Sequence, residues 1–496
     1  MQADTTKTNL ADLFYGLALR YGDRPALVSG DRTLSFRDLV PASTQWAVEL
    51  RDCGIGAGAQ VGLALRDGLD TVVLTLALWM LDAVAVPVDF RSRSDERTRL
   101  AAEFDLTALL EDRDLSGGAY TSIVCDADRA ARVARHTPSL PDRDPAVSHP
   151  AFLSLTSGTT GRPLGIIIGH RTLLLRAMGY GFEGAYPFGG VFLNAYPLSF
   201  SASRNHTIGN LLRGTTIHFH PPIFGAGELV EQINALDASF VFAVPATVTA
   251  MLSLTEDGKA PLMPRLNMLY CGGSGMLATE KQRAWRLLSP NFQHCFSSSI
   301  SGTCSILSGD DLATHHHTDG RVLPTVRLEI VDAEDRPLPL GEVGLMRMRS
   351  HGMADGLYRN RARDTGDRLR DGWAFTGDLA FVSPDGFLTV VGRGSDLIIR
   401  GGANVYPAEI ESILAAMPGV REVAVVGFAD PALGEEIAAF VAGSPTLTEA
   451  TLDAHCRVTL SPDKRPRRFV LVDSLPRNPN GKVLTRDLRA RLEGNT

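Results

Sequence analysis

The segment that decides the fold reads Leu153-Ser154-Leu155-Thr156-Ser157-Gly158-Thr159-Thr160-Gly161-Arg162-Pro163-Leu164-Gly165. Gly158 and Gly161 allow the backbone to turn sharply, and successive backbone N–H groups in such a turn form a concave site that attracts oxyanions. The segment lacks the Gly-Lys-Ser/Thr ending of a Walker A loop. The turn therefore predicts a polyphosphate-binding loop that is not of the Walker A type. Thr156, Ser157, Thr159 and Thr160 in and beside this turn add hydroxyl groups that can rotate to donate hydrogen bonds.

Two apolar runs flank this loop. Residues 151–153 precede it and residues 166–168 follow it, which predicts a tight turn between two buried strands. A flexible surface loop is the alternative that composition alone favours. The loop and its flanks resemble the phosphate loop of the adenylate-forming (AMP-binding) superfamily: acyl-CoA synthetases, nonribosomal peptide adenylation domains and luciferases. In motif the chain is most similar to acyl-CoA synthetases and to the CoA ligases of aryl and fatty acids.

The bulk properties are those of a large globular protein. The chain has 496 residues, of which 44% are hydrophobic and 21% charged, and its net charge of −7 gives no basic patch for nucleic acid. The start lacks a signal-peptide core, and the most apolar run, residues 71–80, is too short for a membrane span. Six scattered cysteines without a CxxC pair predict reduced thiols. We therefore expect a cytoplasmic protein without nucleic-acid or membrane partners; a homodimer is compatible with the sequence.

The order of the apolar segments predicts an α/β fold. Residues 61–65, 69–81 and 83–88 read as strand, helix and strand, which is the unit of a parallel sheet. This rhythm continues to about residue 273, interrupted by a polar, proline-containing stretch over residues 112–148 that predicts a loop. Residues 322–348 change to short alternating strands, as in an antiparallel barrel-like subdomain.

The last hundred residues read as a small separate α+β domain. We expect a large N-terminal domain of layered βα subdomains over residues 1–395 and a small mobile domain over residues 396–496. The hinge would be Asp396. It lies in the segment from Val391 to Glu411, which closely resembles the hinge segment of acyl-CoA synthetases.

The hinge segment carries three expected functions. The resemblance implies that Arg393 contacts the nucleotide, that Asp396 is the pivot, and that Gly402 lines the channel for a pantetheine thiol. A glycine-rich β-hairpin is the alternative interpretation of the same residues.

A carboxylate at Asp378 follows the aromatic run Trp373-Ala374-Phe375-Thr376-Gly377. The pattern predicts a turn at the end of a strand, and an acceptor-only carboxylate suits the two O–H donors of a ribose. An aspartate that caps a turn is the simpler interpretation. The resemblance implies that Asp378 holds the ribose.

Lys482 follows the turn signal Asn480-Gly481. A mobile ammonium suits a site where a carboxylate and an α-phosphate, both anionic, must meet. A surface lysine is the usual interpretation, but lysine occurs in this chain only at positions 7, 259, 281, 464 and 482. The flanks of Lys482 match the catalytic-lysine loop of the family, which implies a catalytic role.

Further residues are assigned by resemblance. Gly273 and Ser274 lie where the family contacts adenine, and Phe296 and Ser297 are expected beside the nucleotide. Ser299 keeps a hydroxyl for a phosphate and is expected, with His170, to be catalytic. Phe200 and Ser298 are expected to contact the substrate.

Three positions depart from the family pattern. Leu164 stands where the phosphate loop normally has lysine, and Phe200 replaces a common histidine. Ile300 stands where the family has a glutamate, so it offers no oxygen ligand for Mg²⁺, which could still be held by phosphates and water. No residue of the chain is assigned to bind a metal; the run His315-His316-His317 predicts a solvated loop.

The segment from Ser201 to His206 is polar where an acyl pocket is expected. One interpretation is a small or anionic substrate held by Arg204 and His206. The alternative is a solvated helix end, and the sequence favours neither.

Three functions are compatible with these features. The first is a ligase that uses ATP and Mg²⁺ to adenylate a carboxylic acid and passes it to the thiol of CoA or a carrier protein. The second keeps the adenylation but changes the partner, as in amide synthetases or diazotases that activate nitrite. The third is a degenerate nucleotide-binding protein without catalysis, against which Asp378, Arg393 and Lys482 argue.

Overall fold

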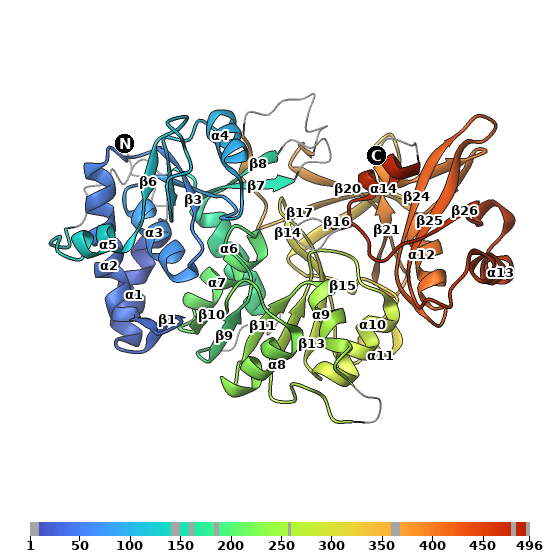
Figure 1. Ribbon diagram of the computed structural model, residues 1–496, viewed down its shortest axis with the longest axis horizontal. Coiled ribbons are helices and arrows are strands. Elements are labelled where there is room, and N and C mark those ends of the chain that lie inside the picture. Colours follow the sequence, from blue (N-terminus) through green and yellow to red (C-terminus); the bar gives the residue numbers. More distant parts are fainter. Residues whose placement is uncertain are drawn as a thin grey trace.

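The computed structural model describes residues 9–139, 149–157, 163–182, 188–255, 259–358, 368–477 and 483–492. In this part the chain forms four sheets with helices packed around them (Figure 1). No described helix is both long and apolar enough to cross a membrane. The predicted α/β fold class is confirmed.

The first sheet contains the strands on either side of the phosphate loop. Its order is β18-β8-β7-β4-β3-β5-β6. β3 and β4 are parallel with α3 between them, as the sequence predicts. β7 and β8 are antiparallel with Ser157 opposite Pro163, which confirms the two predicted strands. The bounds are β3 Gln60–Ala64, β4 Val84–Pro87, β5 Ala108–Glu111, β6 Ser122–Val124, β7 Phe152–Ser157, β8 Pro163–Ile168, β18 Gly356–Leu357 and α3 Gly68–Met80.

The second sheet continues the parallel rhythm. Its nine strands run in the order β15-β14-β13-β12-β11-β9-β10-β1-β2. The strands from β13 to β1 are parallel neighbours, and antiparallel strands lie at both edges. The bounds are β1 Pro25–Ser29, β2 Arg32–Ser35, β9 Val191–Asn194, β10 Thr216–Phe219, β11 Phe240–Ala243, β12 Met268–Cys271, β13 Phe292–Ser298, β14 Gly302–Ser308 and β15 Arg321–Val322.

Helices surround these two sheets. α1 and α2 pack on each other and on α3 at the N-terminal end, and α6 packs on α7 in the middle of the molecule (Figure 1). The bounds are α1 Leu10–Tyr21, α2 Phe36–Asp52, α4 Ser94–Glu103, α5 Ala127–Val133, α6 His170–Phe182, α7 Ser201–Leu211, α8 Ala226–Ala235, α9 Pro245–Leu252, α10 Ala278–Arg283 and α11 Asp311–Thr314.

The loop predicted over residues 112–148 is wrong in part. β6 extends the first sheet there, and α5 follows with its N-terminus capped by the Asp126 side chain, which accepts a hydrogen bond from Arg129 N. Residues 140–148 lie outside the described part. β6 has three residues and α5 seven, so they carry too little hydrophobic periodicity to be predicted.

Two smaller antiparallel-rich sheets complete the chain. One contains β16 and β17, which confirms the strands predicted between residues 322 and 348. The other lies toward the C-terminal end, at the right of Figure 1. Asp396 lies in a short 3₁₀ turn where the chain passes from one to the other; the domain boundary there stays a prediction. The bounds are β16 Val326–Val331, β17 Gly344–Ser350, β19 Leu369–Arg370, β20 Trp373–Val382, β21 Leu388–Arg393, β22 Ile398–Arg400, β23 Ala403–Val405, β24 Val420–Asp430, β25 Gly434–Gly443, β26 Arg468–Leu471, α12 Pro407–Ala415, α13 Glu449–Thr459 and α14 Thr485–Leu492.

Trp79 joins α3 to the start of β7. It is fully buried, its Nε1 donates a hydrogen bond to Ala151 O at 2.9 Å, and its ring meets Phe152 edge-on at 5.4 Å between centroids. The strand that enters the phosphate loop is thus fixed by the core of the N-terminal part.

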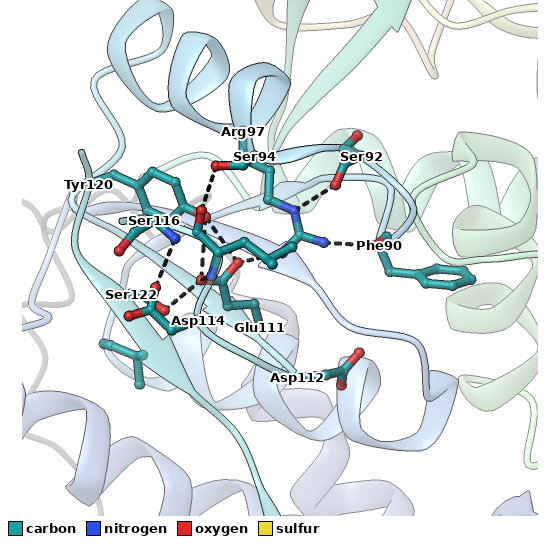
Figure 2. A network of polar contacts seen from close by, with 12 residues as sticks. Phe90, Ser92, Ser94, Arg97, Glu111, Asp112, Asp114, Ser116, Tyr120 and Ser122 are labelled. Carbon is teal, nitrogen blue, oxygen red and sulfur yellow. Dashed lines mark hydrogen bonds and ion pairs between the residues drawn. The ribbon is translucent and has the colours of Figure 1, made fainter. Parts of the chain in front are cut away.

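A buried ion pair joins α4 to β5 (Figure 2). Arg97 Nη1 donates to Glu111 Oε2, and the guanidinium also donates to the carbonyls of Phe90 at 2.7 Å and Ser92 at 3.1 Å. Glu111 also accepts a hydrogen bond from Ser122 Oγ at 2.5 Å. Both charges are therefore removed from water, and each is balanced by the other.

Glu111→Gln tests this balance. The variant leaves Arg97 buried without a counter-charge, and we expect the free energy of unfolding to fall by about 3–5 kcal/mol. Denaturant unfolding measures the change. The double variant Arg97→Met/Glu111→Leu removes both charges and should recover most of the loss; a double variant no more stable than the single one would contradict the account.

Candidate functional site

β7 and β8 are the strands on either side of the predicted phosphate loop. Thr156 pairs with Leu164 across the two strands. The side chains of Thr156 and Ser157 lie outside the described part, as do Gly158, Thr159, Thr160 and Gly161, so the predicted phosphate contacts stay predictions. Leu164 is half-buried and packs against the main hydrophobic core, which suits an apolar residue at this position.

Arg204 connects β7 to the loop before α7. Its Nη2 donates to Ser154 Oγ, and its Nη1 donates to the carbonyls of Leu198 at 2.8 Å and Ser199 at 3.3 Å. The guanidinium carbon lies 4.6 Å from the centroid of the Phe152 ring. The strand that enters the phosphate loop and the segment expected to bind substrate are therefore joined by one side chain.

His206 lies one and a half turns after the start of α7 and is buried among aromatic rings. Its ring lies 5.1 Å from Phe242 and 5.2 Å from both Phe240 and Tyr270 between centroids. Burial lowers the pKa of His206 to about 3, so its imidazole is neutral near pH 7. The interpretation of this segment as a solvated helix end is wrong, because Arg204 and His206 are both buried. Of the two, only Arg204 brings a positive charge.

Phe200 and Gly273 meet. A Cβ at Gly273 would lie 3.5 Å from the Phe200 ring, and the positive φ of +100° at this position favours glycine. Ser274 follows and is half-buried. The structure thus brings the predicted adenine-contacting segment against the loop predicted to contact the substrate.

The turn from Phe296 to Ile300 ends β13. Ser298 Oγ accepts hydrogen bonds from Ile300 N at 3.2 Å and Ser301 N at 3.1 Å, so its hydroxyl closes the turn. The side chain of Ile300 is buried and supplies no oxygen ligand. Beside it, Phe296 and Ser299 are half-buried and Ser297 is exposed.

Arg176 on α6 binds the backbone of this turn through hydrogen bonds. Its Nη2 donates to the carbonyls of Ser299 at 3.0 Å and Ile300 at 3.2 Å, and its Nε donates to Gly352 O at 2.7 Å. The sequence gives no signal for this contact, because a lone arginine on a helix normally lies at the surface.

Asp378 and Arg393 lie opposite each other on β20 and β21. Arg393 Nε is 2.8 Å from Asp378 Oδ1, and its Nη1 donates to Thr376 O at 2.8 Å. The two residues expected to contact the nucleotide are therefore adjacent. The expected turn at the end of a strand is wrong: Asp378 lies inside the ten-residue strand β20, where Gly377 adopts a φ of +78°.

The hinge segment forms the glycine-containing hairpin that was the alternative interpretation. β22 and β23 pair across Gly401 and Gly402, which have φ angles of +58° and +86°. Gly402 is exposed, and a Cβ there would meet nothing within 4 Å; its channel role stays a prediction. Asp396 Oδ1 lies 3.4 Å from Arg489 Nη2 on α14, so the expected pivot contacts the last helix.

Lys482 lies outside the described part. The ends of its loop are brought together, since Arg477 and Val483 form an antiparallel bridge and Leu484 N donates to Pro476 O at 2.8 Å. The constrained loop that would present Lys482, and its catalytic role, stay predictions.

His170 begins α6. Its Nδ1 accepts a hydrogen bond from Leu10 N at 3.2 Å, and its ring packs edge-on against Trp79 at 5.0 Å. These contacts join α6 to the N-terminal helices. A catalytic role for His170 stays a prediction.

Within the described residues, no three His, Cys, Asp or Glu side chains are placed to bind a metal. In the histidine run, His315 stacks on Phe387 at 3.8 Å and its Nε2 lies 3.1 Å from Asp385 Oδ2. These contacts place His315 on the partly exposed surface beside β21.

The chain matches two family models. The model "AMP-binding enzyme" covers residues 16–358, and the model "AMP-binding enzyme C-terminal domain" covers residues 409–482. Among curated relatives, the fatty acid–[acyl-carrier-protein] ligase ScoC of Streptomyces coeruleorubidus is 28% identical over 495 residues, which cover 95% of this chain and 94% of ScoC.

Solved structures share the fold. The anthranilate CoA ligase AuaEII in complex with anthranoyl-AMP superposes with a TM-score of 0.88 at 22% identity, covering 100% of both chains. The o-succinylbenzoate coenzyme A synthetase of Bacillus subtilis with ATP and magnesium gives a TM-score of 0.84 at 22% identity, covering 97% of this chain and 99% of that one.

The buried His206 predicts acid sensitivity. Its pKa is about 3 in the folded protein against 6.5 for a free histidine, so between these values the unfolded state binds the extra proton. The free energy of unfolding contributed by this group is complete above about pH 6.5 and falls as pH drops toward 3, by about 1.4 kcal/mol per pH unit. His206→Phe should flatten the dependence of unfolding on pH between about 4 and 6. Exposed His351 provides the control variant His351→Phe, and equal slopes in both variants would contradict the prediction.

Proposed function

Because the chain belongs to the AMP-binding enzyme family, we propose that it is an ATP-dependent acid–thiol ligase. It adenylates a carboxylic acid, releases pyrophosphate, and transfers the acyl group to the thiol of CoA or of a carrier protein. Relatives named as a fatty acid–carrier-protein ligase and as CoA ligases support this assignment.

The observation that carries the proposal is the adjacent pair Asp378 and Arg393. A nearly buried carboxylate, oriented by an arginine on the next strand, suits the two hydroxyls of a ribose. The guanidinium beside it suits the phosphate of the same nucleotide. Phe200 and Gly273 would border the base and the acid.

ATP enters as its magnesium complex. The donor set for ATP fits, since Asp378 accepts hydrogen bonds and the phosphate-loop sequence supplies N–H and hydroxyl donors. At the position where the family has a glutamate, the buried and apolar Ile300 offers no oxygen ligand for Mg²⁺. Phosphate oxygens and water would hold the ion, and no step depends on a protein ligand to it.

The first half-reaction joins two anions. A carboxylate oxygen attacks the α-phosphorus in line, the new P–O bond forms, and pyrophosphate leaves. Lys482 offsets the charge that gathers on the α-phosphate, so positioning and electrostatics account for most of the rate.

The second half-reaction transfers the acyl group. The thiolate sulfur attacks the acyl carbon, the thioester forms, and AMP leaves with the oxygen that came from the acid. The small domain turns about Asp396 between the two steps, which withdraws Lys482 and admits the thiol beside Gly402.

The enzyme belongs in the cytoplasm. None of the six cysteines forms a disulfide, which agrees with a reducing compartment. A homodimer stays a prediction that sedimentation would test.

Pyrophosphate release from ATP and Mg²⁺ across a panel of carboxylic acids, each with and without CoA, tests the function. Release that depends on an acid and rises with CoA is expected. Release with nitrite alone would move the protein to the diazotase-like function. No release with any compound would favour a nucleotide-binding protein without catalysis.

Lys482→Ala separates the two half-reactions. The variant removes the ammonium needed only in the first, so we expect adenylate formation to fall at least about 100-fold. Thioester formation from a synthetic acyl-adenylate should change little. Arg477→Ala, at the edge of the same loop, is the control, and an equal loss in both half-reactions of Lys482→Ala would contradict a two-conformation mechanism.

A further inference from the structure

Lys281 is a buried lysine in a chain whose basic residues are mostly arginine. Lysine occurs at only five positions, whereas lysine and arginine together occupy 49. Lys281 is 3% exposed. It lies on α10, which begins at Ala278, shortly after the predicted adenine-contacting residues Gly273 and Ser274. No step of the proposed reaction uses this residue.

The ammonium of Lys281 pairs with Asp319, in the segment between β14 and β15. Its Nζ lies 3.2 Å from Asp319 Oδ1 and donates a hydrogen bond to Thr318 O at 2.8 Å. Burial raises the pKa of the Asp319 carboxyl, but the positive charge of Lys281 and the hydrogen bonds outweigh it, so this pKa lies below its usual value. Asp319 is therefore a carboxylate near pH 7.

The same carboxylate binds β21. Asp319 Oδ2 accepts a hydrogen bond from Val390 N at 2.9 Å, and Asp319 N donates one to Leu388 O at 2.7 Å. Val390 lies three residues before Arg393, which is opposite Asp378 on β20. The ion pair therefore connects α10 to the strand that carries half of the expected ribose and phosphate site.

The backbone around Asp319 lies between two sheets. Gly320 has a φ of +90°, and a Cβ there would overlap the backbone of Ile306 on β14, so this position requires glycine. Ser305 Oγ, also on β14, donates to Asp319 O at 2.7 Å, and Leu388 N on β21 donates to Gly320 O at 2.9 Å. The segment thus contacts the nine-stranded sheet on one side and the five-stranded sheet on the other.

His294 shows how near the ammonium lies to the predicted adenine-contacting segment. It is on β13 opposite Cys271, which ends β12 and leads toward Gly273. Burial, together with the positive charge of Lys281, lowers the pKa of His294 to about 3. The imidazole is therefore neutral near pH 7 and brings no charge to the ion pair.

The predicted nucleotide site is divided between the two sheets. Gly273 and Ser274 follow β12 of the nine-stranded sheet, whereas Asp378 and Arg393 lie on β20 and β21 of the five-stranded sheet (Figure 1). A nucleotide that contacts both parts binds best when their spacing is fixed beforehand, because ordering a site on binding costs affinity. The buried ion pair lies where the two parts are joined.

Stability alone does not account for a buried ion pair at this junction. Replacing such a pair with apolar residues is often neutral or stabilising, because the cost of removing two charges from water offsets their attraction. What the pair adds is a defined geometry, since the ammonium of Lys281 must meet two particular oxygen atoms.

We propose that Lys281 and Asp319 are positioning residues for the nucleotide. They hold the adenine-contacting segment and the Asp378–Arg393 pair at the spacing that an adenosine phosphate requires, and they do so without touching it. This inference rests on the nucleotide binding that the proposed function requires. Loss of the pair leaves each part of the site intact and weakens only those ligands that span both parts.

AMP and ribose 5-phosphate test the proposal, because only AMP has a base that reaches the adenine-contacting segment. Calorimetry of the full-length protein measures the affinity and the active fraction separately, and ribose 5-phosphate is measured by displacement of AMP. In Lys281→Met we expect the affinity for AMP to fall about 10-fold and that for ribose 5-phosphate to stay unchanged. Unchanged AMP affinity, or equal losses for the two ligands, would overturn the proposal.

Two further variants separate positioning from stability. Lys281→Met/Asp319→Asn removes both charges and keeps an acceptor for Val390 N, so it should recover the melting temperature lost in Lys281→Met but not the AMP affinity. Recovery of both would show that the pair is structural only. Arg97→Met is the matched control: it breaks a buried ion pair between α4 and β5 and should lower the melting temperature without changing either affinity.

Asp319→Asn covers the case in which Lys281→Met does not fold. It keeps the shape of the side chain and the acceptor for Val390 N while weakening the ion pair, so AMP affinity should fall in the same direction by a smaller factor. Unchanged AMP affinity in this variant would overturn the proposal.

Failure of this inference and failure of the ligase function give different results. If the variants lose AMP affinity selectively but the unaltered protein releases no pyrophosphate with any acid, the ligase function is refuted and this inference stands. Pyrophosphate release together with unchanged AMP affinity in the variants does the reverse. No AMP binding by the unaltered protein would overturn both.

Discussion

β7 is the strand on which the site depends. One end is fixed by the hydrogen bond from Trp79 to Ala151 and by the packing of Trp79 on Phe152. Its middle is joined to the loop before α7 by Arg204 and Ser154. Its far end pairs with β8 and leads into the phosphate loop. The contact with Trp79, the contact with Arg204 and the predicted phosphate loop therefore all depend on the position of this strand.

Two charged residues of the family pattern are replaced by apolar ones in this chain. Leu164 stands in place of a lysine and Ile300 in place of a glutamate, so one positive and one negative charge are lost and the net charge of the site is nearly unchanged. Both residues pack into the hydrophobic interior. In the turn that contains Ile300, the carbonyls of Ser299 and Ile300 accept hydrogen bonds from Arg176. This turn is thus stabilised by an arginine and carbonyls in a place where the family pattern expects a metal ligand.

The sequence predicts the family because its motifs resemble those of the adenylate-forming enzymes, and it predicts most helices and strands because the spacing of apolar residues is a local property of the chain. The parallel strands from β3 to β12 and the β7–β8 pair follow from such periods. β6 and α5 are too short to show such a period. Asp378 was expected at a strand end because a Thr-Gly-Asp run is typical of turns; the pairing of β20 with β21 extends the strand through it. The burial of Arg204 depends on a contact with Ser154, which lies 50 positions away in the sequence, so no local pattern reveals it.

The central claim is that the acid and the α-phosphate of ATP become covalently joined. The most direct measurement uses a carboxylic acid labelled with ¹⁸O in its carboxylate, ATP, Mg²⁺ and CoA, with the products analysed by mass spectrometry. An acyl-adenylate places one labelled oxygen in AMP and none in pyrophosphate, and this is the predicted result. Label in inorganic phosphate, or AMP without label, would show that the acid is activated in another way and would contradict the account.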